Sequence, residues 1–260
     1  MKQRTAVRRC PAIFVTGTDT GVGKTLVTAA LAARLTERRY SIGVMKPVET
    51  GIGQTAVSDA VRLRRAAGTR DVLDLIRPYA FRQPVAPLDA AQLSKKSISL
   101  SVIMRAVRDL RSRHDLVLIE GVGGVHVPLT RTVDVLELIS QLKLPTVVVG
   151  RASLGGVNHA LLTVKALRHR GIPIVALVLN RTSSPRTAYA QRQERSTTRL
   201  LRELAGVPVI GPLPFYSALS HRFDDEVVRL ARTAPITGLM RLVLASGRGR
   251  TSRHGLHPAP

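Results

Sequence analysis

The stretch that most constrains this fold spans residues 13–25 and reads IFVTGTDTGVGKT. Its first residues, Ile13–Val15, are apolar and predict a buried strand, and a Gly-rich turn then leads into a helix that begins near Lys24. A strand, a Gly-rich turn and a helix in this order bind phosphate through backbone N–H groups and the helix N-terminus. The strict pattern G-x-x-x-x-G-K-[ST] is not fully met, because Thr18 replaces its first Gly and Gly17 comes one residue early. We therefore predict a phosphate-binding loop, with a Gly-rich turn that binds nothing as the alternative.

Five polar side chains suit the binding of a nucleotide and its metal ion. Two of them end this stretch, and the other three lie at the ends of other predicted elements. Lys24 would reach the β- and γ-phosphates, and the Thr25 hydroxyl would bind Mg²⁺. Glu120 ends an apolar strand and is the natural acidic metal ligand, because Mg²⁺ binds few protein oxygens together with phosphate oxygens and waters. Asp59 is a candidate second carboxylate, with an acid that only stabilises a helix start as the alternative. Lys46 is a second candidate cation, and its alternative is a solvated surface lysine.

Short apolar segments alternate with helical ones along the chain. The predicted strands are residues 13–15, 41–45, 115–119, 144–149, 172–179 and 207–211. The predicted helices are residues 26–39, 58–67, 99–113, 133–142, 157–170, 189–205 and 226–244. This alternation predicts an α/β fold of the P-loop NTPase type, with a mostly parallel central sheet and helices on both faces. We also expect a Gly-rich turn over Glu120–Gly124 and a break of the last helical stretch at Pro235.

Both ends of the sequence are basic and contain no acid, which sets the predicted domain boundaries. We predict a basic N-terminal tail over residues 1–11, a single P-loop α/β domain over 12–245 and a basic, disordered C-terminal tail over 246–260. Disorder is expected where apolar content is this low. Within the domain, prolines divide residues 70–98 into short pieces, which we interpret as an excursion from the main sheet.

The formal net charge of +23 arises mostly from arginine spread along the chain. It fits either binding to nucleic acid or an anionic surface, or an Arg-biased composition with affinity for anionic nucleotides. Four Phe, four Tyr and no Trp leave little to stack on bases, so we predict no specific nucleic-acid partner. No apolar stretch reaches the length of a membrane span, and no apolar signal segment follows the basic N-terminus. With Cys10 as the only cysteine, these features predict a cytoplasmic protein without a membrane partner.

Several segments, taken together and in their order along the chain, resemble one known protein family. They are VTGTDTGVGKT (Val15–Thr25), KPVETG (Lys46–Gly51), SDA (Ser58–Ala60), LIEGVGGVHVPL (Leu118–Leu129), LGGVNHALLT (Leu154–Thr163), Asn180 and GPLPF (Gly211–Phe215). Together they resemble the ATP-dependent dethiobiotin synthetases of biotin biosynthesis. The phosphate loop alone would not separate that family from its relatives, whereas KPVETG, EGVGG and GGVNHA do so much better.

The resemblance implies a ligase that joins CO2 to 7,8-diaminononanoate and closes a cyclic urea at the expense of ATP. One amine becomes a carbamate, whose oxygen attacks the γ-phosphate to give a mixed carbamic–phosphoric anhydride. The second amine then attacks the carbonyl, and phosphate leaves. Lysines and Mg²⁺ suit this chemistry, because phosphoryl transfer depends mainly on positioning and charge stabilisation. The resemblance also implies a homodimer with the substrate site at its interface.

Roles for individual residues follow from the same resemblance. The implied catalytic residues are Lys46, Lys24 and Thr20, with Lys46 bridging the carbamate and the transferred phosphoryl group. The implied ATP-binding residues are Thr20, Gly21, Val22, Gly23, Lys24, Thr25, Glu120, Gly123, Asn180, Pro212 and Pro214. The implied substrate-binding residues are Lys46, Thr50, Gly155, Gly156 and Asn158, of which the last three would bind the substrate carboxylate. The implied Mg²⁺ ligands are Thr25, Asp59 and Glu120.

Three other functions are weighed against this one. A partitioning-type ATPase carries a signature lysine early in the loop, where this chain has Asp19. An amide-forming synthetase of cobalamin synthesis needs a nucleophilic Cys in a glutaminase domain, whereas Cys10 lies upstream of the loop. A degenerate, non-catalytic nucleotide-binding protein is disfavoured because the lysines and carboxylates above are all present. One departure from the family is Leu88, which stands where a His often follows Pro in the substrate-side loop.

Overall fold

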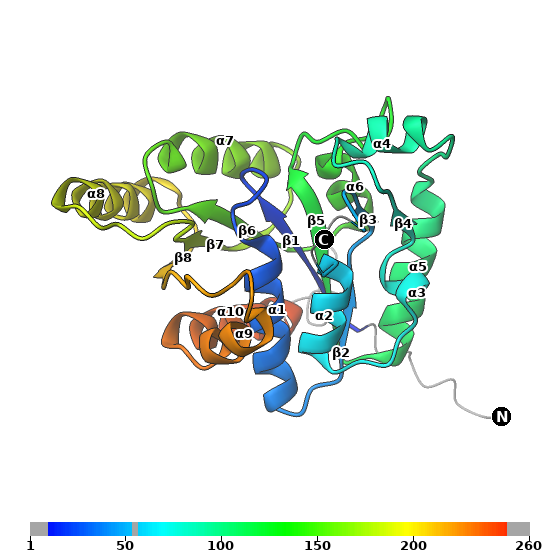
Figure 1. Ribbon diagram of the computed structural model, residues 1–260, viewed down its shortest axis with the longest axis horizontal. Coiled ribbons are helices and arrows are strands. Elements are labelled where there is room, and N and C mark those ends of the chain that lie inside the picture. Colours follow the sequence, from blue (N-terminus) through cyan, green and yellow to red (C-terminus); the bar gives the residue numbers. More distant parts are fainter. Residues whose placement is uncertain (1–9, 54–56, 249–260) are drawn as a thin grey trace, which may run out of the picture.

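The computed structural model describes residues 10–53 and 57–248, in which six strands form one parallel sheet (Figure 1). Across the sheet the strands are β2 (Ile42–Met45), β5 (Leu116–Gly124), β1 (Ala12–Gly17), β6 (Thr146–Arg151), β7 (Ile174–Asn180) and β8 (Val209–Leu213). The chain builds one half of the sheet on each side of β1, so the strand order reverses there. Ligands of such sheets bind beyond the carboxyl ends of the strands at this reversal.

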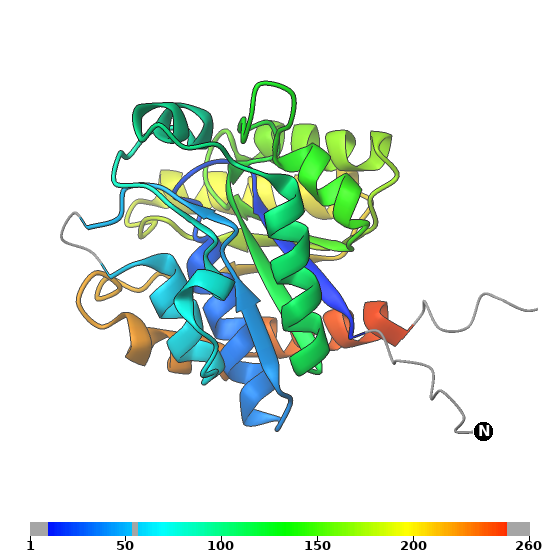
Figure 2. The same cartoon turned by 90° about the vertical axis from the view of Figure 1, so that its right-hand side faces the viewer.

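Helices cover both faces of the sheet (Figures 1 and 2), which confirms the predicted fold class. Side chains alternate along β1, so Ile13 and Val15 face one core and Phe14 faces the other. The core of Ile13 contains α1 (Lys24–Glu37), α2 (Asp59–Ala67), α9 (Phe223–Ala231) and α10 (Ala234–Arg248). The core of Phe14 contains α5 (Leu100–Arg113), α6 (Val135–Leu142), α7 (Gly156–His169) and α8 (Ala188–Leu204).

Residues 70–98 do leave the main sheet, as predicted, and they form α3 (Leu73–Ile76), β4 (Tyr79–Ala80) and α4 (Pro87–Leu93). Strand β4 pairs in parallel with β3 (Val48–Glu49), which follows β2 along the chain. Backbone bonds extend this pairing, from the Lys46 N–H to the Ile76 carbonyl at 2.8 Å and from the Phe81 N–H to the Glu49 carbonyl at 2.9 Å. The excursion therefore supports the segment that begins at Lys46.

The predicted turn over Glu120–Gly124 is wrong, because β5 continues through these residues to Gly124. Glu120 thus lies inside the strand and pairs with Val15 of β1. The Gly content has another cause here: a Cβ on Gly121 would lie 2.8 Å from Cε1 of Phe14. A register shift then brings Gly124 opposite Gly17. Glycine permits the close approach of β5 to the start of the phosphate loop.

The C-terminal helical stretch is interrupted next to Pro235, as predicted, but it begins earlier than predicted. It begins at Phe223 and divides between α9 and α10, before Ala234, so that Pro235 lies in the first turn of α10. Proline fits this turn because its missing N–H would have no partner inside the helix. Helix α10 continues to Arg248, so the predicted tail boundary at residue 246 falls inside a helix. The rest of that tail and residues 1–9 lie outside the described residues. Within residues 10–53 and 57–248, no helix has the length and apolar character that a membrane span needs.

Cys10 allows a direct test of this packing. Its side chain is buried before β1, and burial raises the pKa of the thiol to about 11. At that value roughly one thiol in a thousand is ionised at pH 8. We expect 5,5′-dithiobis(2-nitrobenzoate) to leave the native protein almost unlabelled at pH 8 and to label one thiol per chain in 6 M guanidinium chloride. Rapid full labelling without denaturant would contradict the burial.

Candidate active site

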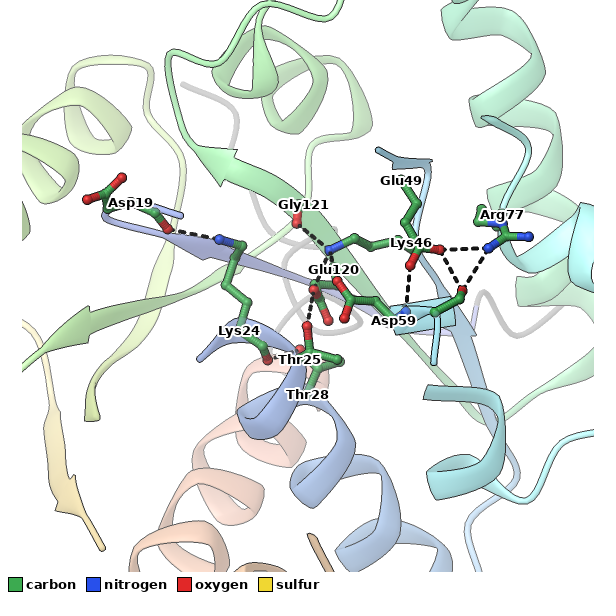
Figure 3. Close-up of polar contacts among 11 residues, drawn as sticks. Asp19, Lys24, Thr25, Thr28, Lys46, Glu49, Asp59, Arg77, Glu120 and Gly121 are labelled. Atoms are coloured by element: carbon green, nitrogen blue, oxygen red, sulfur yellow. Dashed lines mark hydrogen bonds and ion pairs between the residues drawn. The ribbon is translucent and has the colours of Figure 1, made fainter. Parts of the chain in front are cut away.

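The phosphate loop connects β1 to α1, and two of its glycines have backbone conformations that other residues rarely adopt. Gly21 and Gly23 have φ angles of 72° and 99°. A Cβ on Gly23 would also lie 2.2 Å from Nδ2 of Asn180, so Gly is required there twice over. The Lys24 ammonium points back along the loop and donates to the Asp19 carbonyl at 2.9 Å (Figure 3). The loop thus presents backbone and a cation to one side, as phosphate binding requires.

A compact cluster of charged groups lies beside this loop (Figure 3). The Lys46 ammonium, just after β2, lies 2.5 Å from Oε1 of Glu120 and 3.1 Å from Oδ2 of Asp59. The Thr25 hydroxyl at the start of α1 donates to the same Glu120 oxygen at 2.9 Å. Residues predicted separately from three strand ends and a helix start therefore converge on one point.

Burial and mutual attraction set the ionisation of this cluster. Burial, and then the nearby Lys46 ammonium, lowers the pKa of Lys24 to about 8. Burial would also lower the pKa of Lys46, but Glu120 and Asp59 outweigh it and raise that pKa. Burial raises the pKa of Glu120, although Lys46 opposes the change. Burial would raise the pKa of Asp59 too, yet Lys46 holds it below its usual range. Lys46 is therefore the resident counter-ion of both carboxylates.

The cluster opens into a cavity of about 720 Å³. The predicted site residues that line it are Thr20, Gly21, Gly23, Lys24, Thr25, Lys46, Thr50, Asp59, Glu120 and Gly123. Val22 is fully buried beneath the loop, and its carbonyl accepts a hydrogen bond from Nδ2 of Asn180 at 3.0 Å. The geometry thus brings the proposed phosphate, metal and carbamate residues together, while their individual roles stay predictions.

Two groups of predicted residues lie apart from this cavity in the described structure. Gly155 and Asn158, at the start of α7, line a second cavity together with Leu154 and residues of α8. Gly156 adjoins them, and a Cβ there would lie 2.3 Å from the Arg151 carbonyl oxygen. Pro212, in β8, lines a third cavity beside α8, and Pro214 follows that strand. One copy of the chain therefore does not bring these residues to Lys46.

Several residues that line the main cavity were not predicted. Arg62 of α2 holds its guanidinium 4.4 Å from the ring centre of Phe223, and both side chains line the cavity. Arg62 lies one helical turn after Asp59, a spacing that could have signalled a shared face. Ala86 and Pro87 line the cavity, whereas Leu88 is not among its lining residues. Glu49 also lines it, and no sequence signal links Glu49 to its distant partners.

Comparison with known proteins decides the family. The sequence profile of a family described as an AAA domain matches residues 11–222. An ATP-dependent dethiobiotin synthetase from Thermodesulfovibrio yellowstonii is 36% identical over 218 residues, covering 80% of this chain and 90% of that protein. A synthetase of the same name from Anaeromyxobacter dehalogenans is 47% identical over 170 residues, covering 65% of this chain and 76% of that protein.

The chain belongs to the ATP-dependent dethiobiotin synthetase family. Solved structures agree on the fold. The MinC:MinD cell division protein complex of Aquifex aeolicus matches with a TM-score of 0.54 and 13% identity over 95% of this chain and 98% of that chain. A ParA family ATPase from Chlorobium tepidum matches with 0.52 and 14% over 92% and 99%. At such low identity the likeness shows the P-loop NTPase fold alone. The predicted resemblance to the synthetase family is confirmed by the sequence identities to the two synthetases above.

Asp19 has a local role at the position of the partitioning-type signature lysine. Its carboxylate accepts hydrogen bonds from the Thr20 N–H at 2.7 Å and from Arg151 at 3.1 Å. Asp19 therefore stabilises the turn of the phosphate loop through contacts within its own chain.

Lys46→Met tests whether the ammonium stabilises the cluster. The variant leaves two carboxylates without their cation, and breaking such a buried pair costs roughly 3–5 kcal/mol. We expect a lower melting temperature in EDTA, and a larger rise on adding Mn²⁺ than the wild type shows, because the metal replaces the lost charge. Differential scanning calorimetry measures both effects.

A matched control is Lys165→Met, which removes an exposed lysine of α7. It should melt like the wild type with and without Mn²⁺. Equal melting temperatures for the wild type and Lys46→Met would show that the cluster contributes nothing to stability.

Proposed function

We propose that this chain catalyses the ATP- and Mg²⁺-dependent carboxylation and ring closure of 7,8-diaminononanoate with CO2 to dethiobiotin. The observation that carries the proposal is the meeting of Lys24, Lys46 and the oxygen donors around Glu120 beside a phosphate loop. Relatives that bear the name ATP-dependent dethiobiotin synthetase supply the reaction class. The reaction is therefore phosphoryl transfer to a carbamate, followed by closure of a cyclic urea.

The donor set fits Mg²⁺. Thr25, Asp59 and Glu120 offer one hydroxyl and two carboxylates, and Oε2 of Glu120 is buried with no hydrogen-bond partner among the described residues. Mg²⁺ prefers a few such oxygens with phosphate oxygens and waters completing its shell. When bound, the metal would offset the charge of the β- and γ-phosphates.

The remaining cavity residues then divide between the two substrates. Lys24 holds the β- and γ-phosphates once it leaves the Asp19 carbonyl. Lys46 bridges the carbamate and the transferred phosphoryl group, and Thr20 and Thr50 place the carbamate end. Each of these side chains stabilises charge where it develops, which is the main protein contribution to phosphoryl transfer. The carbamate oxygen attacks the γ-phosphorus, and ADP leaves as the bond to the β,γ-bridging oxygen breaks. The second amine then attacks the carbonyl carbon of the mixed anhydride, loses a proton and displaces phosphate.

Asn180 is the proposed adenine reader. Its Nδ2 is committed to the Val22 carbonyl, whereas its buried Oδ1 has no partner among the described residues. That oxygen is an acceptor for the adenine amino group. Pro212 and Pro214 then form the neighbouring wall of the base site.

A second copy of the chain completes the substrate site in this proposal. Gly155, Gly156 and Asn158 offer the N-terminus of α7, which suits a carboxylate, yet they lie outside the main cavity of their own chain. Leu154 and Tyr189 beside them are 73% and 71% exposed, as expected for residues that another chain covers. A homodimer would bring this loop to the substrate tail. A cytoplasmic location, where ATP is supplied, also stays a prediction.

The test of the reaction is an assay with 7,8-diaminononanoate, bicarbonate, Mg²⁺ and ATP. We expect release of ADP to depend on the diamine and dethiobiotin to form in equal amount. The matched control contains every component except the diamine, and it should release no ADP above background. ADP release that is independent of the diamine would defeat the proposal.

Lys46→Ala separates catalysis from nucleotide binding. We expect turnover to fall by about 10³-fold or more, because the variant removes a charge that acts on the transferred group. Binding of ATP should largely survive, because Lys24 and the loop remain. Steady-state kinetics and calorimetric titration with an ATP analogue measure the two effects, and retained turnover would remove Lys46 from the mechanism.

A further inference from the structure

Glu49 is a buried carboxylate to which the proposed reaction gives no role. It lies in β3 between Lys46 and Thr50, with 7% of its side chain exposed. It accepts hydrogen bonds from the Asp59 N–H at 2.5 Å, the Ser58 hydroxyl at 2.8 Å and Arg77 at 2.9 Å (Figure 3). Burying a carboxylate is unfavourable unless it is paired and hydrogen-bonded, so these bonds must form together.

The bond to the Asp59 N–H gives Glu49 the role of a helix cap. Ser58 precedes α2, but its hydroxyl makes no capping bond to the helix. That hydroxyl instead donates to Glu49 and accepts from Arg77 at 2.7 Å. The first N–H group of α2 is thus satisfied by a carboxylate from another segment, which suits the positive end of a helix.

The same contact holds the backbone from which the Asp59 side chain extends. Asp59 is the first residue of α2, and its carboxylate lies 3.1 Å from the Lys46 ammonium. Glu49 therefore holds the backbone of Asp59 from one side while Lys46 faces its carboxylate from the other (Figure 3). Arg77 comes from the residues just before β4, which pairs with β3. Three segments of the chain are joined through the Glu49 carboxylate.

We propose that Glu49 is a positioning residue that orients Asp59 for Mg²⁺ and so sets the metal affinity of the site. The inference rests on the proposed function, because it takes Asp59 as a Mg²⁺ ligand. Arg77 neutralises the Glu49 charge, so that Glu49 orients the metal site without adding a net negative charge to it.

Two substitutions at residue 49 separate orientation from charge. Glu49→Ala removes the acceptor for the Asp59 N–H, and we expect the Mg²⁺ concentration for half-maximal turnover to rise about tenfold or more, as for other residues that orient metal ligands. Glu49→Gln keeps one oxygen for that N–H, so its Mg²⁺ dependence should lie closer to the wild type than to Glu49→Ala. An equal effect of both substitutions would overturn the orienting role.

Asp71→Ala is the matched control for general destabilisation. The Asp71 side chain is also 7% exposed, and it lies 2.7 Å from Nε2 of His114. His114 contacts Ser41, and both residues stand at the amino ends of β5 and β2, opposite the site. Asp71→Ala should lower the melting temperature yet leave the Mg²⁺ dependence of turnover unchanged. A shift as large as that of Glu49→Ala would show that lost stability alone explains the effect.

Direct binding of Mn²⁺ supplies a measurement that does not require turnover. Electron paramagnetic resonance titration with ADP present should show weaker Mn²⁺ binding in Glu49→Ala and in Asp59→Asn. The double variant should bind no more weakly than Asp59→Asn alone, because Glu49 acts through Asp59.

These titrations also separate the two proposals. Unchanged Mn²⁺ binding in Asp59→Asn would remove Asp59 from the metal site and with it part of the proposed function. Weakened binding in Asp59→Asn with wild-type binding in Glu49→Ala would overturn only the positioning role of Glu49.

Discussion

The Lys46 ammonium, held between Glu120 and Asp59, is the interaction on which the geometry of the site depends. Its partners come from the middle of β5 and the start of α2, while Lys46 itself follows β2. Because Lys46 and Glu120 are buried and Asp59 is partly buried, these charges would be unfavourable without one another. The end of β2, the first turn of α2 and the middle of β5 must therefore take their native positions together. The Thr25 hydroxyl joins α1 to the same Glu120 oxygen, so the phosphate loop is included.

Local sequence patterns were enough to predict the fold class. Strands buried on both faces are continuously apolar, and this feature marked each main strand between helices of ordinary length. What failed was the interpretation of glycine. The run after Glu120 looks like a turn, but Gly121 is small because Phe14 of the neighbouring strand lies against it. Phe14 is distant in sequence, so its close approach cannot be deduced from the run itself. Pro235, in contrast, correctly predicted a break in the last helical stretch, because the break lies just before it and the proline occupies the first turn of α10.

The site was predictable to the extent that its residues stand at the ends of strands. Lys24, Lys46 and Glu120 each end or follow an apolar run, and parallel strands bring their carboxyl ends to one edge. Glu49 offers no such signal, because its contacts with Ser58 and Arg77 depend on how β3 and β4 pair. Residues at the start of α7 show a different limit. Their sequence resembles a substrate-binding loop, but one chain does not bring them to the cavity of Lys46.

Residues 70–98, whose structure was the hardest to predict from the sequence, support the segment that carries Lys46 and Glu49. Residues 76–83 accept or donate backbone bonds along the whole segment from Lys46 to Gly51, and Arg77 among them completes the contacts of Glu49. This small parallel sheet fixes the backbone that carries Lys46. Without it, a lysine with four rotatable side-chain bonds would extend from an unsupported loop. Preorganised charge is more effective in phosphoryl transfer than charge that must be gathered during the reaction. An irregular segment that contains several prolines therefore supports the site through its backbone bonds and through the contacts of Arg77 with Glu49 and Ser58.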